Sequence, residues 1–129
     1  MDNIKIIFFD IDGTLIGLNQ GRPTDKVLEA LKRLQNSGVR ICLATGRSPV
    51  QLPVFPGVEF DAYMTFNGSY CFDKKGVISS RPLKREDVAT IIGNASAMGR
   101  PVAMALVDRI AANGADEDLR QYFDFSGHK

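Results

Sequence analysis

The stretch IKIIFFDIDGTL, residues 4–15, decides the fold. Residues 4–9 are nearly all apolar and rich in Ile and Phe, which is typical of a strand buried on both faces of a sheet. Asp10 and Asp12 follow directly, and Gly13 opens a turn. Two carboxylates at the end of a buried strand, beside a glycine turn, can build a site for phosphoryl transfer.

A helix and a second strand are predicted after a loop over residues 13–23. Thr24 can cap the helix, and the apolar residues that follow recur on one helical face. Gly38 can end the helix in a left-handed conformation. Residues 39–44 form the next predicted strand. Such a strand–helix–strand unit implies two parallel strands joined by a right-handed crossover.

The polar residues of this unit are expected to meet at one edge of the sheet. Ligands of open parallel sheets bind beyond the carboxyl ends of the strands. Asp10, Asp12 and Thr45 all fall at those ends. The topology alone therefore predicts a polar site there.

The rest of the chain changes character near residue 81. Its predicted elements are, in order, an irregular segment over 48–60, a strand over 62–66, a hairpin over 70–79, a helix over 84–98, a strand over 101–107 and a helix over 116–123. A domain boundary is expected at Arg81-Pro82, which separates residues 1–81 from residues 82–129.

The composition is that of a globular chain. Of the 129 residues 44% are hydrophobic and 24% charged, and the net charge of +1 gives no reason to expect nucleic acid or a membrane as partner. No secretory signal pattern is visible, so a cytoplasmic protein is predicted. Cys42 and Cys71 are interpreted as buried thiols, and His128 lies too near the end of the chain to be expected as a catalytic base.

The residues at the predicted edge suit phosphate chemistry. An aspartate can attack phosphorus, while a second acid protonates the leaving oxygen. A Mg²⁺ ion would relieve the repulsion between carboxylates and phosphate. Backbone N–H groups of Ile11, Asp12 and Gly13 can cradle phosphate oxygens. Thr45 adds a hydroxyl donor and Gly46 an unobstructed N–H.

Two structural alternatives exist for the Asp-X-Asp-Gly pattern. A calcium loop of the EF-hand type needs further oxygen ligands, and Ile16, Leu18 and Arg22 stand where they would fall. A plain turn after a strand is the other alternative.

At this point the sequence resembles the haloacid dehalogenase (HAD) superfamily, and within it the Cof-type sugar-phosphate phosphatases. Residues 8–15 match the first family motif, residues 43–47 the second, and residues 65–68 the passage into the cap domain. The resemblance implies an α/β fold: a HAD-like Rossmannoid parallel sheet, present in part over residues 1–81, with the beginning of an α+β cap over residues 82–129.

The resemblance also implies roles. Asp10 would be the nucleophile and a Mg²⁺ ligand, and Asp12 the acid/base, with its backbone carbonyl as a second ligand. Thr45 and Gly46 would hold the phosphate. Two further residues are expected near the substrate: Arg47 and Asn67. The implied activity is Mg²⁺-dependent hydrolysis of a small phosphorylated metabolite through an aspartyl-phosphate.

Two further family motifs, a lysine and a Gly-Asp acidic cluster, have no counterpart in the 129 residues. The chain is therefore expected to be the N-terminal portion of a longer enzyme, with one edge of strand Ile4–Phe9 open to self-association. The alternatives are a catalytically impaired remnant that acts as a Mg²⁺/phosphate-binding or interaction module, and a phosphomutase.

Overall fold

The computed structural model describes residues 3–125 and divides into two compact units. The first comprises Met1–Arg47 and Leu52–Arg81, and the second Ser48–Gln51 and Pro82–Lys129. The expected assignment of residues 1–81 to a catalytic core and of residues 82–129 to a cap remains a prediction.

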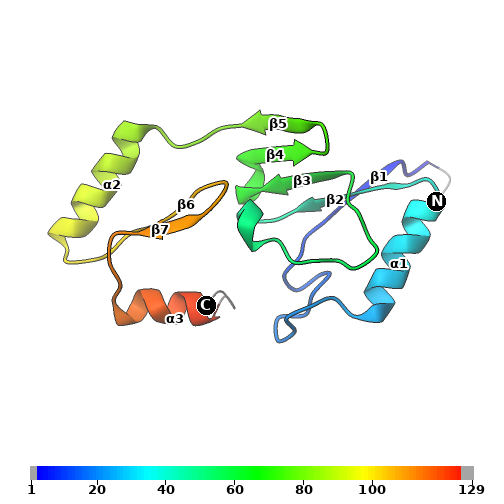
Figure 1. The fold of residues 1–129 in the computed structure, drawn as a ribbon, viewed down its shortest axis with the longest axis horizontal. Coiled ribbons are helices and arrows are strands. Elements are labelled where there is room, and N and C mark those ends of the chain that lie inside the picture. Colours follow the sequence, from blue (N-terminus) through cyan, green and yellow to red (C-terminus); the bar gives the residue numbers. More distant parts are fainter. Residues whose placement is uncertain (1–2, 126–129) are drawn as a thin grey trace. The chain divides into compact units, whose positions relative to one another are not determined.

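The first unit is built on one five-stranded sheet (Figure 1). Its strands lie in the order of the sequence: β1 (Ile6–Phe9), β2 (Arg40–Ala44), β3 (Ala62–Thr65), β4 (Tyr70–Asp73) and β5 (Gly76–Ser80). The first three are parallel, and β4 and β5 form an antiparallel hairpin. The predicted parallel pair and the predicted hairpin are both confirmed.

Helix α1 (Asp25–Asn36) connects β1 to β2. The Thr24 hydroxyl accepts a hydrogen bond from the Val27 amide at 3.4 Å, and Asp25 places a negative charge in the first turn. Gly38 has a φ of +84°, which ends the helix as predicted. Leu31 is the fully buried residue of the apolar face, and it packs between the helix and the sheet.

The core lies on one face of the sheet. It is formed by Ile11, Leu15, Ile16, Leu31, Ile41, Leu43, Phe55 and Phe60. A row of aromatic rings extends it, with the Phe55 and Phe60 rings 5.1 Å apart and the Tyr63 and Phe72 rings stacked at 5.0 Å.

Strand β1 differs from its prediction. Residues 4–9 were expected to be buried on both faces, but Ile6 is 44% exposed and Phe8 is 51% exposed. The reason is the position of β1 at the end of the strand order, together with the alternation of side chains along a strand. Phe9 packs against the core, whereas Ile6 and Phe8 point to the other face.

The second unit contains a short 3₁₀ helix (Pro49–Gln51), α2 (Arg85–Ala97), β6 (Ala103–Ala105), β7 (Ile110–Ala112) and α3 (Glu117–Phe125). Strands β6 and β7 pair antiparallel. Strand β7 was not predicted, since three residues are too few for a visible alternation. Within residues 3–125 no helix is long and apolar enough to cross a membrane. His128 lies outside the described residues.

Candidate active site

The ends of β1 and β2 bring the predicted motifs together. The two strands are parallel, with Phe9 opposite Leu43. Asp10 therefore leaves β1 at the edge of the sheet where Ala44 and Thr45 leave β2. This register is what the sequence argument assumed, and it makes the edge the candidate active site.

A tight turn follows Asp10. The Ile11 side chain is fully buried, and its carbonyl accepts hydrogen bonds from the amides of Leu15 and Ile16, both at 3.0 Å. Gly13 has a φ of +83°, a conformation that disfavours any residue with a side chain. The Gly13 amide donates to the Ile16 carbonyl at 2.8 Å. In this structure that amide is engaged within the turn, and its donation to a phosphate oxygen stays a prediction.

Asp10 presents its carboxylate to solvent at the end of β1. Within residues 3–125 its side chain makes no hydrogen bond or ion pair with other side chains. An exposed carboxylate without a competing cation is a suitable nucleophile toward an electrophilic phosphorus.

Thr45 is 5% exposed and is held at three points. Its amide donates to the Met64 carbonyl at 2.9 Å, and its carbonyl accepts from the Asn67 amide at 3.0 Å. Its hydroxyl oxygen accepts from the Arg47 amide at 3.1 Å. Because that bond uses an oxygen lone pair, the hydroxyl hydrogen is left to donate to another acceptor.

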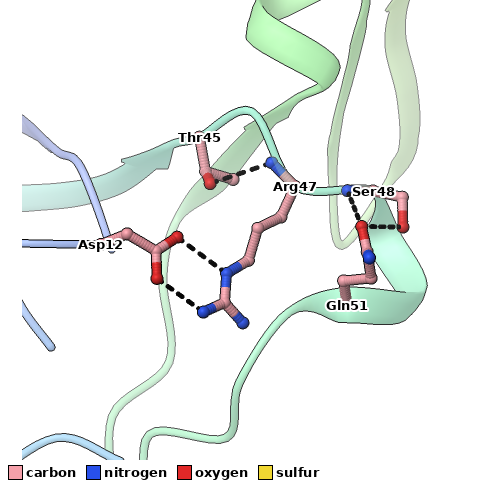
Figure 2. A network of polar contacts seen from close by, with 5 residues as sticks. All are labelled: Asp12, Thr45, Arg47, Ser48 and Gln51. Atoms are coloured by element: carbon pink, nitrogen blue, oxygen red, sulfur yellow. Dashed lines mark hydrogen bonds and ion pairs between the residues drawn. The ribbon is translucent and has the colours of Figure 1, made fainter. Parts of the chain in front are cut away.

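Asp12 and Arg47 form a two-point ion pair across 35 residues of sequence (Figure 2). Arg47 Nε donates to Asp12 Oδ2 at 2.9 Å, and Nη2 donates to Oδ1 at 2.6 Å. This is the fork geometry that a guanidinium adopts with a carboxylate. The hydrogen bond to Asp12 raises the pKa of Arg47, which keeps the guanidinium charged.

Asn67 lies over Gly46 in an unusual turn. Phe66 and Asn67 have φ values of +49° and +55°, a region that non-glycine residues rarely adopt. A Cβ at position 46 would lie 3.1 Å from Asn67 Oδ1. Because Gly46 has no side chain, there is room beside it for the side-chain amide of Asn67.

Sequence reasoning missed the residues that support these loops. Thr65 is fully buried, and its hydroxyl donates to the Tyr70 carbonyl at 2.7 Å, which ties the two ends of the Asn67 turn together. Directly after Arg47 along the chain, the amide and hydroxyl of Ser48 both donate to Gln51 Oε1. A hydroxyl residue at a strand end, before Asn-Gly, is the signal that could have revealed Thr65.

A metal ion has only a partial set of ligands in residues 3–125. No group of three or more His, Cys, Asp or Glu side chains is placed there to hold one. The Asp10 carboxylate and the Asp12 main-chain carbonyl are hard oxygen donors of the kind that Mg²⁺ accepts. The donors present therefore fit Mg²⁺ in kind, and further ligands would have to complete the shell.

Comparison with known proteins gives a consistent result. A family model of haloacid dehalogenase-like hydrolases matches residues 7–129. The protein YkrA of Bacillus subtilis (strain 168) is 28% identical over 113 residues, which are 87% of this chain and 44% of YkrA. The HMP-PP phosphatase of Enterobacter sp. (strain 638) is 32% identical over 90 residues, which are 68% of this chain and 33% of that enzyme.

Solved structures share the fold. The HAD subclass IIB sugar phosphatase BT4131 is 29% identical, with a TM-score of 0.80 over 97% of this chain and 50% of that chain. The phosphatase BT1666 from Bacteroides thetaiotaomicron is 27% identical, with a TM-score of 0.82 over 97% of this chain and 47% of that chain. The chain thus spans about half the length of these two structures. It spans less than half the length of YkrA and of the HMP-PP phosphatase.

These matches confirm the expected HAD-like Rossmannoid fold and the resemblance on which it was based. With a family match that runs from β1 to the end of the sequence, the chain belongs to the haloacid dehalogenase-like hydrolases.

Proposed function

We propose that this chain carries part of the active site of a phosphatase that hydrolyses a small phosphorylated metabolite through an aspartyl-phosphate. The observation that carries the proposal is the meeting of Asp10, Asp12 and Thr45 at one edge of a parallel sheet. The relatives support it, since phosphatases of HMP-PP and of sugars are among them.

Each residue has a part in the proposed reaction. An Asp10 carboxylate oxygen attacks phosphorus, the bond to the ester oxygen breaks, and Asp12 gives its proton to that leaving oxygen. Water then attacks the aspartyl-phosphate while Asp12 takes up a proton, which restores Asp10 and yields inorganic phosphate. The Thr45 hydroxyl donates to a phosphate oxygen throughout, and the amide of Gly46 is the proposed second donor.

Mg²⁺ is the proposed cofactor, held by the Asp10 carboxylate and the Asp12 main-chain carbonyl. When bound it would offset the charge that the carboxylates and the phosphate bring together. The remaining ligands, and the lysine that the family resemblance implies, would have to come from outside the residues described. We also propose that the protein is cytoplasmic.

The substrate is proposed only as a class. A small phosphomonoester suits an exposed edge with one nucleophile and one hydroxyl donor. The backbone N–H groups of Ile11 and Gly13 are proposed further donors to the phosphate. Arg47 and Asn67 are the proposed contacts to the rest of the substrate.

Turnover of p-nitrophenyl phosphate in the presence of Mg²⁺ tests the proposal, with Asp10→Asn as the matched variant of nearly identical size. We expect hydrolysis that falls by at least about 10²-fold in Asp10→Asn, since the amide cannot form the phosphoenzyme. Equal rates in both proteins would favour the alternative of a Mg²⁺/phosphate-binding or interaction module. Turnover that depends on an added sugar bisphosphate would favour a phosphomutase.

Self-association through the open edge of Ile4–Phe9 is a further part of the proposal. An edge strand with exposed apolar side chains offers unpaired backbone groups to a second copy. Ile4, Ile6 and Phe8 are each more than 40% exposed.

A further inference from the structure

Asp12 makes a contact that conflicts with its proposed role. Both of its carboxylate oxygens accept hydrogen bonds from the Arg47 guanidinium, at 2.9 and 2.6 Å. A group that exchanges a proton with a leaving oxygen must turn one of those oxygens toward the substrate. While the two-point pair is intact, both oxygens are directed at Arg47 instead (Figure 2).

Two hydrogen bonds hold the backbone of Arg47, so the pair with Asp12 can open by rotation of side chains alone. Its amide donates to Thr45 Oγ1 at 3.1 Å, and its carbonyl accepts from the Phe66 amide at 3.0 Å. The Arg47 side chain is 20% exposed and the Asp12 side chain 49% exposed. A ligand in solution can therefore reach the pair, and rotation of the arginine side chain needs no change in the loop.

A phosphate group can compete for the same guanidinium. The planar fork of an arginine binds phosphate oxygens as well as carboxylate oxygens. The Thr45 hydroxyl, whose oxygen touches the Arg47 amide, is the proposed anchor for that phosphate. A phosphate placed there lies beside the root of the Arg47 side chain.

We infer that Arg47 is a positioning residue that exchanges partners: it holds the Asp12 carboxylate until a phosphate group binds, and then turns to the phosphate. The released Asp12 carboxylate can take up a proton from water and turn toward the leaving oxygen to donate it. This inference rests on the proposed function, because it uses the roles of Asp12 and Thr45. It follows that binding of the substrate's phosphate frees Asp12 to act as the acid/base.

The test measures phosphate binding and not turnover, so that its result is separate from that of the Asp10→Asn assay. Inorganic phosphate is titrated into the 129-residue chain, and the Arg47 Nε–H signal is followed by ¹H–¹⁵N NMR. Arg47→Lys identifies the signal by its loss. Exchange of partners predicts a saturable shift of this signal.

A double-mutant cycle separates the exchange from simple charge repulsion. Asp12→Asn removes the competing carboxylate, so phosphate should bind about two- to fivefold more tightly, the range in which an exposed ion pair competes. In an Arg47→Met background the same Asp12→Asn change should give a smaller gain. Arg47→Lys should recover part of the affinity that Arg47→Met loses.

Three results would overturn the inference. The first is an Arg47 Nε–H signal that phosphate does not move, and the second is an equal gain from Asp12→Asn in both backgrounds. The third is the absence of phosphate binding in every variant. Loss of Asp10-dependent turnover with an intact exchange would instead count against the phosphatase proposal alone.

Discussion

Gly46 packs closely against Asn67 in the candidate site. A methyl group at position 46 would lie 3.1 Å from Asn67 Oδ1, so one of the two residues would have to move. The backbone N–H of Asn67 donates a hydrogen bond to the Thr45 carbonyl, and the Asn67 backbone has a left-handed conformation. The loop around Thr45 therefore depends on the missing side chain of Gly46.

Gly46→Ala is expected to lower the free energy of unfolding by about 1 kcal/mol, the cost of a modest steric overlap. It should also weaken phosphate binding, because the Thr45 loop shifts. Urea unfolding and phosphate titration measure the two effects. Gly21→Ala is the matched control in the same unit: nothing lies within 4 Å of its would-be Cβ, and a change below about 0.5 kcal/mol is expected. Equal effects at both positions would contradict the steric argument.

Among the elements, those with a strong local signal were predictable. The strand–helix–strand unit follows from an apolar run, a capped amphipathic helix and Gly38, all of which are short-range features. The Asp12–Arg47 pair was not predictable, since it joins residues that only the register of β1 and β2 brings together. The left-handed conformation of Phe66 was also hidden, because no glycine or asparagine stands there to indicate it.

Strand β1 shows the limit of composition as a guide. Its apolar run correctly indicated a strand, but burial on both faces requires elements packed on both faces of the sheet. In the described residues Ile6 and Phe8 lie on the face of β1 that stays exposed. The local sequence shows which side chains of a strand are apolar, but packing of the other elements determines which of them are buried.

Phe8→Lys is expected to weaken the proposed self-association. Phe8 is 51% exposed on the edge strand, and a lysine there adds charge and removes apolar area worth about 1.5–3 kcal/mol. The dissociation constant should rise at least about tenfold, as measured by sedimentation over a concentration series. Val77→Lys on β5, where Val77 is 58% exposed, leaves β1 unchanged and is the control for association of β1 with β1. A chain that is monomeric before any substitution would rule out the contact.

At the scale of the whole molecule, stability should depend on pH through a buried thiol, Cys42, and a half-buried phenol, Tyr63. Burial raises the pKa of the Cys42 thiol above its ordinary value of 9.0, and burial likewise raises the pKa of Tyr63 above 10.0. A raised pKa in the folded state means that the unfolded chain loses its proton first. The protonated forms of the two groups therefore stabilise the folded state. This contribution to the free energy of unfolding is complete below pH 9 and is lost as the pH rises through the pKa values of the folded state.

The free energy of unfolding should therefore fall as the pH rises above about 9, with a slope of at most about 1.4 kcal/mol per pH unit for each group. Urea unfolding at a series of pH values measures it. Cys42→Ala should reduce the slope whatever its effect on stability at pH 7. An unchanged slope in that variant would show that Cys42 does not contribute.

The strand order has a final consequence for assembly, because the two edges of the sheet are different. Strand β1 ends the parallel side, and β5, with Val77 and Ile78 about 60% exposed, ends the antiparallel side. Pairing of β1 with β1 across a twofold axis closes after two copies, whereas pairing of β1 with β5 leaves a fresh edge at each addition and builds a fibre. Val77→Lys distinguishes these outcomes: it spares a closed dimer and stops an open-ended polymer.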